Sequence, residues 1–275
     1  KDYYCNQLES KSGSQAREYL DQRELSASTI KELDLGLAPP QRDALKKHLL
    51  DAGQPLELLL KSGLVVQREG GKTVDRFRNR LMVPICRDTG SVIAFGGRSL
   101  TPDQQPKYLN SPETPLYSKG RVLYGLNLTK QDIRRLGYAV LVEGYFDFAQ
   151  AFQAGVRTVV ATCGTALTQM QSRLLKRSCT KVLLSFDPDT AGQGASTRSG
   201  ELLLSEGFQT NVVTLAAGED PDSFVRLHGA NSYRLKLKQS QPYLEYVLDR
   251  ASNGRNLSRQ KDQRDFLEAM LAVAA

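Results

Sequence analysis

The sequence is poor in the residues that bind transition metals. Its 275 residues include no tryptophan and only two histidines, His48 and His228. The four cysteines are too scattered for a paired CxxC zinc site, so we expect reduced, buried thiols and no zinc. With histidine-rich and thiolate sites excluded, any bound metal should be a hard cation held by carboxylates.

Long apolar runs and targeting signals are also missing. Apolar stretches such as residues 139–142 have the length of a strand and fall far short of the ~20 residues of a membrane-spanning helix. The chain begins at Lys1 and shows no signal-peptide pattern. We therefore expect a soluble, cytoplasmic protein with no membrane partner, excised from a longer chain.

Positive charge is concentrated in one part of the sequence. The chain has 37 lysines and arginines against 30 acidic residues, a formal charge of +7. Residues 61–135 hold 14 basic and 6 acidic side chains, whereas residues 136–225 hold 6 basic and 9 acidic ones. A basic segment beside an acidic one suits a polyanion held against carboxylate-bound cations. Charge that merely keeps the surface soluble explains the same excess, so both interpretations stay open.

Two kinds of periodicity divide the first 127 residues. Residues 14–62 have helical spacing of apolar positions, interrupted at Pro39-Pro40. Residues 74–98 predict a β-hairpin that turns at residues 88–90. Residues 101–121, rich in proline, serine and asparagine, predict an ordered loop. We expect a basic α+β subdomain over residues 1–127.

From residue 128 onward, short apolar runs alternate with helical segments. The runs, each of strand length, are residues 138–144, 156–162, 181–187 and 209–215. This alternation predicts an α/β domain at 128–228, with a parallel sheet flanked by helices. Helical periodicity returns over residues 241–272 and predicts a carboxyl-terminal helical subdomain at 229–275.

Acidic residues follow three of the four predicted strands. Glu143 ends the first run, Asp187 and Asp189 follow the third, and Asp220 and Asp222 follow the fourth. Because ligands bind outside the carboxyl ends of parallel strands, we expect these side chains to converge at one edge of the sheet. In an extended chain Asp187 and Asp189 point the same way, so both can face one cation.

A further acid, Asp147, lies four positions after Glu143, a spacing that places both side chains on one side of a helix. Crowded carboxylates are costly unless cations neutralise them, because like charges raise one another's pKa. The acids therefore predict two or more Mg²⁺ or Mn²⁺ ions, which leave coordination positions for phosphate oxygens. As single elements, the Asp-Pro pairs are also ordinary turn formers.

The basic segment contains three alternating arginines, Arg76, Arg78 and Arg80. In a strand all three side chains would project from one face, with Asn79 on the other. The planar guanidinium group of arginine offers a fork of N–H donors that suits phosphate. Charges that protect an edge strand from aggregation are the alternative. Tyr108 and Tyr117, next to lysines, could stack bases of a single strand or anchor the loop in the core.

These motifs resemble a known family. Glu143-Gly144 with the later Asp187-Pro188-Asp189 resembles the Toprim domain of primases, topoisomerases and some nucleases. Over roughly residues 1–228 the chain is similar to bacterial-type DNA primases, the DnaG family. The segments that carry this resemblance are DRFRNRLMVPI (75–85), FGGRSL (95–100), PKYLNSPET (106–114), KGRVLYGL (119–126), EGYFDF (143–148) and GEDPDSFV (218–225).

The resemblance implies a Toprim fold, with a Rossmann-like parallel sheet flanked by helices, and a metal-dependent RNA polymerase that makes short primers. Its implied partners are single-stranded DNA and ribonucleoside triphosphates, with the replicative helicase and single-strand-binding protein bound through other parts of the parent chain. The implied catalytic residues are Glu143, Asp187 and Asp189. The implied metal ligands are Glu143, Asp147, Asp187, Asp189, Asp220 and Asp222. The implied nucleic-acid and nucleotide contacts are Arg76, Arg78, Asn79, Arg80, Lys107, Asn110 and Lys119.

Two positions depart from the family pattern. Pro188 stands where the family usually has glycine, which bears on metal geometry, and Thr190 stands where an arginine often offers a phosphate contact. Two other functions remain open at this stage: another Toprim enzyme, either a nuclease or a topoisomerase fragment, and a non-catalytic nucleic-acid-binding module. Nucleotide-dependent RNA synthesis would distinguish them.

Overall fold

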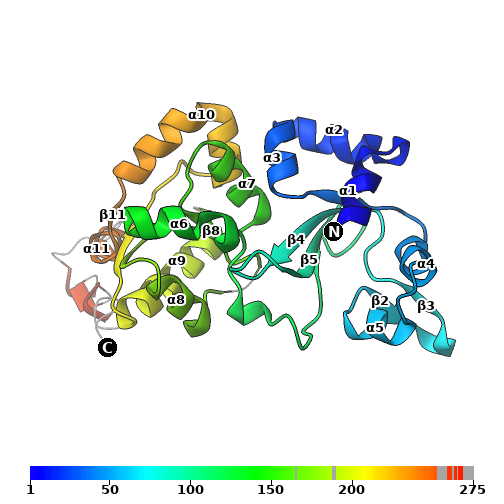
Figure 1. Ribbon diagram of the computed structural model, residues 1–275. Helices are drawn as coiled ribbons and strands as arrows, with labels where there is room; N and C mark the ends of the chain where they lie inside the picture. Colours follow the sequence, from blue (N-terminus) through cyan, green and yellow to red (C-terminus); the bar gives the residue numbers. More distant parts are fainter. Residues whose placement is uncertain (165, 188–189, 253–258, 262, 265, 269–275) are drawn as a thin grey trace. The chain divides into compact units, whose positions relative to one another are not determined.

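The computed structural model describes residues 1–164, 166–187, 190–252, 259–261, 263–264 and 266–268. It divides into two compact units, Lys1–Asn127 and Leu128–Ala275 (Figure 1). No helix within the described residues has the length and apolar character needed to cross a bilayer. The helices after residue 228 belong to the second unit, and a separate subdomain at 229–275 stays a prediction.

The first unit is built on a four-stranded antiparallel sheet. Its strand order is β1 (Gly36–Ala38), β4 (Arg80–Cys86), β5 (Val92–Ser99) and β6 (Tyr108–Asn110). The predicted hairpin is confirmed, because β4 pairs with β5 and the chain turns between Arg87 and Ser91. β6 lies inside the stretch that was expected to be a loop, and it extends the sheet beyond the hairpin.

Helices and a small hairpin complete this unit. They are α1 (Asp2–Glu9), η1 (Lys11–Gly13), α2 (Ser14–Gln22), α3 (Ala27–Glu32), α4 (Ala44–Asp51), α5 (Leu56–Lys61), β2 (Val65–Gln67), η2 (Glu69–Gly71), β3 (Thr73–Asp75) and η3 (Lys119–Arg121). Residues 14–62 were expected to be helical. They form α2, α3, α4 and α5, but β1 lies between α3 and α4. The buried side chains of Tyr4, Met82 and Phe95 form a core with neighbouring apolar groups.

Asp75 connects the small hairpin to α4. Its buried carboxylate accepts hydrogen bonds from the backbone N–H groups of Leu45 (2.8 Å) and Lys46 (2.9 Å). Helix amino termini leave N–H groups without intrahelical partners, and a carboxylate there stabilises the first turn. The last residue of β3 thus fixes where α4 begins.

The second unit contains a five-stranded sheet. Its order is β11 (Gln241–Pro242), β10 (Gln209–Val212), β9 (Lys181–Leu184), β7 (Tyr138–Val142) and β8 (Val159–Ala161). All four predicted strands are present and pair in parallel. The short edge strand β11 pairs antiparallel with β10 and was not anticipated. Burial of the central strands on both faces explains their nearly continuous apolar sequences.

Helices flank this sheet. They are α6 (Leu126–Leu136), α7 (Tyr145–Gln153), α8 (Gln169–Lys176), α9 (Thr190–Ser205), α10 (Pro221–Lys238) and α11 (Tyr243–Ser252). Right-handed crossovers place α7 on one face and α8 and α9 on the other, because the chain reverses direction across the sheet after β8. In agreement, α7 packs against α10 and α8 against α9 (Figure 1).

The strand order creates a switch point beside β7. The chain leaves β7 for β8 on one side and then returns to β9 on the other. The connections that follow β7 and β9 therefore diverge to opposite faces and leave a crevice at the carboxyl ends of these two strands. Glu143 directly follows β7, and Asp187 lies three residues after β9.

Candidate functional site

Three carboxylates meet at this edge of the second unit. Asp147, Asp187 and Asp220 each offer one oxygen, and these oxygens all lie within 4.8 Å of one another. Asp147 comes from α7, Asp187 from the segment after β9, and Asp220 from the amino-terminal cap of α10. We call this group the acidic centre. The expectation that acids from separate strand ends converge is correct for Asp187 and Asp220, and Asp147 joins them from the first turn of α7.

Asp147 is the most buried member of the acidic centre, with 8% of its surface exposed. Its Oδ2 accepts a hydrogen bond from the Gly144 N–H (2.9 Å) and its Oδ1 accepts one from the Asp222 N–H (3.3 Å). The expected helical i,i+4 relation to Glu143 is wrong, because α7 begins at Tyr145 and Glu143 precedes its cap, Gly144. Asp147 instead reaches back over the first turn of α7.

Electrostatics make the acidic centre unfavourable without a counterion. Burial raises the pKa of Asp147 to about 8, and the negative charges of Asp220 and Asp187 add to this rise. Hydrogen bonds from Gly144 and Asp222 oppose it only in part. A divalent cation with a preference for oxygen ligands would neutralise the three acids, so the donor set is compatible with a divalent metal ion.

The other predicted acids lie nearby on the same elements. Asp222 is 1% exposed and its Oδ1 lies 3.2 Å from the Arg226 Nε. The backbone carbonyl of Glu143 accepts a hydrogen bond from the Cys163 N–H (2.8 Å), which joins the ends of β7 and β8. Neither Glu143 nor Asp222 belongs to the group of three described above. Asp189 lies outside the described residues, as does Pro188, and these assignments stay predictions.

Asp220 also has a structural role at the amino terminus of α10. Its Oδ1 accepts a hydrogen bond from the Ser223 N–H (2.7 Å), and Pro221 follows as the first helical residue. This is the usual chemistry of a helix start, so the turn-forming interpretation of Asp220-Pro221 is correct locally. The same cap directs the Asp220 carboxylate toward Asp147 and Asp187, so the two roles coexist.

The first unit has a cavity of about 410 Å³ that brings the predicted arginines together. Its lining residues are Val66, Gln67, Arg68, Arg76, Arg78, Arg80, Gln104, Gln105, Pro106 and Leu109. We call it the arginine cavity. The expected strand through the arginines is wrong, because residues 76–79 lie between β3 and β4 and Asn79 has a φ of 50°. The irregular backbone nevertheless brings all three arginines into the lining of one cavity.

The three arginines are held by backbone carbonyls. Arg76 donates from Nε (3.2 Å) and Nη2 (2.8 Å) to the Asn110 carbonyl, and Arg78 donates to the Asp75 carbonyl. Arg80 is 2% exposed and donates to the carbonyls of Gly97 (3.1 Å) and Pro106 (2.8 Å). These bonds fix the guanidinium groups in place, and Arg80 uses much of its donor capacity inside the protein.

The remaining predicted contacts are not among the residues that line the arginine cavity. Lys107 is exposed, and Lys119 is half-buried with its backbone N–H donating to Glu113 Oε1 (2.8 Å). Tyr117 is 3% exposed, so its role as a core anchor is confirmed. Tyr108 is 39% exposed, and the Arg98 guanidinium lies 5.1 Å from its ring centre.

Among the residues that line the arginine cavity, Arg68 and Gln104 carry polar donors and were not predicted from the sequence. Arg68 follows β2, and Gln104 lies in the loop before β6, where its Nε2 donates to the Arg78 carbonyl (2.8 Å). The basic character of residues 61–135 covers Arg68 without singling it out. Nothing in the local sequence marks Gln104, because only the fold brings its loop to the arginines.

Comparison with known proteins gives a consistent result for both units. Residues 3–130 match the family described as DNA primase catalytic core, N-terminal domain, and residues 140–225 match the family described as Toprim-like. A DNA primase of Halalkalibacterium halodurans is 38% identical over 265 residues, which is 96% of this chain and 44% of that protein. The chain thus spans less than half the length of this curated relative.

Solved structures agree over nearly the whole chain. The RNA polymerase domain of Mycobacterium tuberculosis primase DnaG matches with a TM-score of 0.89 and 32% identity, covering 98% of this chain and 89% of that one. A DnaG primase catalytic domain bound to single-stranded DNA matches with a TM-score of 0.87 and 34% identity, covering 99% and 86%. Both units therefore have the fold of these catalytic cores, and the chain belongs to the DnaG family of DNA primases.

Proposed function

We propose that this chain is the catalytic core of a primase, which synthesises short RNA primers on single-stranded DNA from ribonucleoside triphosphates. The observation that carries the proposal is the acidic centre, in which three carboxylate oxygens lie within 4.8 Å at the carboxyl edge of a parallel sheet. Family membership supplies the reaction class, and the structural relative bound to single-stranded DNA supports the template.

Asp147, Asp187 and Asp220 would hold Mg²⁺ or Mn²⁺, with Glu143, Asp189 and Asp222 as further candidates. Such ions lower the pKa of an attacking hydroxyl and stabilise negative charge on the reacting phosphate. The protein's own contribution is to fix the ligands: the cap of α10 orients Asp220, and two backbone N–H groups orient Asp147. We assign Glu143, Asp187 and Asp189 to the catalytic set.

The basic first unit would bind the polyanions. Arg76 and Arg78 border the arginine cavity with their positions fixed by carbonyls, so little conformational entropy is lost when they contact a phosphate. Arg80 would act mainly by shaping this cavity, since it is buried. We assign Asn79, Lys107, Asn110 and Lys119 to the same surface, and exposed Tyr108 offers a ring on which a base can stack.

The reaction also implies partners and a location. The growing primer needs ribonucleoside triphosphates and a single-stranded template, and the parent protein would meet the replicative helicase and single-strand-binding protein through segments beyond this chain. Replication takes place in the bacterial cytoplasm, where we place the protein.

The test is template-directed incorporation of labelled ribonucleotides with Mg²⁺ or Mn²⁺. We expect short RNA products that require template and that fall by at least about 100-fold in Asp187→Asn, because removal of a charged ligand weakens the metal site. Asp249→Asn is the matched control, since Asp249 is exposed on α11 and lies outside the acidic centre. Synthesis that persists in Asp187→Asn would refute the assigned role, and metal-dependent cleavage of DNA without synthesis would favour a Toprim nuclease.

A further inference from the structure

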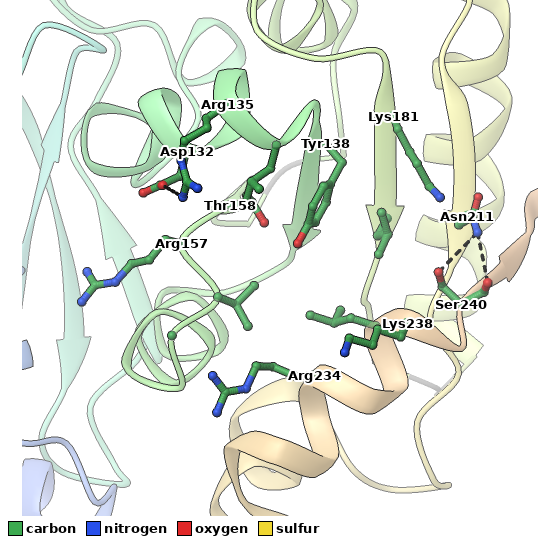
Figure 2. Close-up of a pocket in the computed structure, with 15 residues that line it drawn as sticks. Asp132, Arg135, Tyr138, Arg157, Thr158, Lys181, Asn211, Arg234, Lys238 and Ser240 are labelled. Atoms are coloured by element: carbon green, nitrogen blue, oxygen red, sulfur yellow. Dashed lines mark hydrogen bonds and ion pairs between the residues drawn. The ribbon is translucent and has the colours of Figure 1, made fainter.

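A second cavity, of about 520 Å³, lies in the second unit away from the acidic centre. Tyr138 and Lys181, the first residues of β7 and β9, border it (Figure 2). The acidic centre follows the last residues of these same strands, so the sheet separates the two sites by roughly 15 Å at ~3.3 Å per residue. We call this the amino-edge cavity.

Unpaired positive charge surrounds the amino-edge cavity. Lys181, Arg234 and Lys238 border it, and none of them makes an ion pair with any carboxylate among the described residues. The one acid in the lining, Asp132, is already paired with Arg135. Arginine and lysine repel one another when they share a concave surface, so such a group is favourable when an anion occupies it.

A buried hydroxyl provides an independent observation. Thr158 is 1% exposed, and its Oγ1 is buried with no hydrogen-bond partner among the described residues. Figure 2 shows this oxygen turned into the cavity, as is the hydroxyl of Tyr138. A buried polar atom without a partner is unfavourable, and a ligand acceptor at this place would satisfy it.

Helix ends account for only part of the charge. Arg135 lies in the last turn of α6 and Lys238 in the last turn of α10, where the helix macrodipole favours cations. Lys181 opens a strand and Thr158 precedes one, so the macrodipole explains neither of them. The inference therefore rests on Lys181, Arg234 and Thr158.

The walls between these polar groups are apolar. Leu183, Val156 and Leu237 border the cavity, and the ring of Tyr138 stands beside them (Figure 2). The volume is in the range that encloses a small molecule rather than a strand of nucleic acid. Cations at the rim, hydroxyl donors and an aromatic ring together match a ligand with several phosphates and a planar base.

From these observations we infer that the amino-edge cavity is a binding site for a small, multiply phosphorylated anion of the size of a nucleoside triphosphate. This site is separate from the proposed polymerase site and requires no divalent cation, because lysine and arginine provide the positive charge. Its test is therefore independent of whether the chain synthesises RNA.

The test is calorimetric titration of the full chain with ATP and with inorganic tripolyphosphate, in EDTA, so that metal-dependent binding at the acidic centre is absent. We expect each probe to bind at a site that depends on Lys181 and Arg234. Lys181→Gln and Arg234→Gln should each weaken this binding about tenfold. Thr158→Val should weaken it roughly three- to tenfold while the melting temperature is unchanged or higher, because the variant removes an unsatisfied buried group.

Two matched variants separate this site from general charge. Lys236→Gln removes one cation from the same helix, α10, outside the cavity lining, and Asp187→Asn alters the acidic centre; both should bind like the wild type. The inference is overturned if neither probe binds, if Lys236→Gln weakens binding as much as Arg234→Gln, or if orthophosphate binds as tightly as tripolyphosphate. If single-stranded DNA displaced both probes equally well from the wild type and from Lys181→Gln, the probes would bind elsewhere. That result would also overturn the inference.

Discussion

Neutralising Asp147 should change how the stability of the metal-free protein depends on pH. Burial, with the charges of Asp220 and Asp187, raises the pKa of this carboxyl to about 8 in the folded state, whereas an unfolded aspartate has a pKa of ~3.9. The folded protein therefore holds a proton that the unfolded chain releases between these two values. The stability due to Asp147 is complete below pH ~4 and is lost as the pH rises through 8.

The expected slope follows from this difference in proton binding. Between pH 5 and 7 the folded state holds one proton more than the unfolded chain. The free energy of unfolding therefore falls by about 1.4 kcal/mol for each unit by which the pH rises. Coupling to Asp220 and Asp187 spreads the titration over a wider range, so we expect about 1 kcal/mol per unit. Asp147→Asn keeps the shape and cannot ionise, so its stability should lack this contribution.

The assay is urea denaturation in EDTA at pH 5.5, 6.5 and 7.5, followed by circular dichroism. The quantity of interest is the difference between wild type and Asp147→Asn at each pH, which removes the contribution of all other groups. Asp249→Asn, an exposed carboxyl on α11, should follow the wild type. Parallel curves for wild type and Asp147→Asn would refute the raised pKa, and added Mg²⁺ should flatten the wild-type curve if a cation binds here.

Substitutions at four further positions test the first unit by urea denaturation and template binding. Arg80→Ala should lower the free energy of unfolding by about 3 kcal/mol, because the carbonyls of Gly97 and Pro106 lose a charged donor; an unchanged midpoint would contradict its buried role. Asp75→Ala should lower the free energy of unfolding by about 2 kcal/mol, because the first turn of α4 loses its carboxylate acceptor. Asp75→Asn should lower it less. Tyr117→Ala should cost about 3–4 kcal/mol, since the side chain is buried. Tyr108→Ala should cost less than about 1 kcal/mol and instead weaken single-stranded DNA binding; the reverse pattern would exchange the roles of the two tyrosines.

The parallel sheet and its acidic edge were predictable because burial acts on many residues at once. Each central strand is covered on both faces, so its sequence is a short apolar run, and helical segments between such runs imply parallel pairing. Once the strands are parallel, acids that follow them share one edge. This is why Asp187 and Asp220, 33 positions apart, were expected to meet.

Other features depend on contacts that a local pattern does not reveal. The alternation of Arg76, Arg78 and Arg80 has the period of a strand, but Asn79 adopts a left-handed conformation and the segment turns. Strand β11 has two residues and exists only because it pairs with β10. The amino-edge cavity combines Lys181 with Arg234, 53 positions later, and neither residue stands out in the sequence.

Binding of a divalent cation tests the proposed role of the acidic centre directly. Binding of Mn²⁺ to the chain is measured as the loss of the electron paramagnetic resonance signal of unbound Mn²⁺, and Mg²⁺ should reverse it. This assay needs neither template nor substrate. We expect wild type and Asp249→Asn to bind Mn²⁺ equally, and Asp147→Asn, Asp187→Asn and Asp220→Asn each to bind at least about tenfold more weakly. Undiminished Mn²⁺ binding in all three variants would show that the acidic centre is not the metal site.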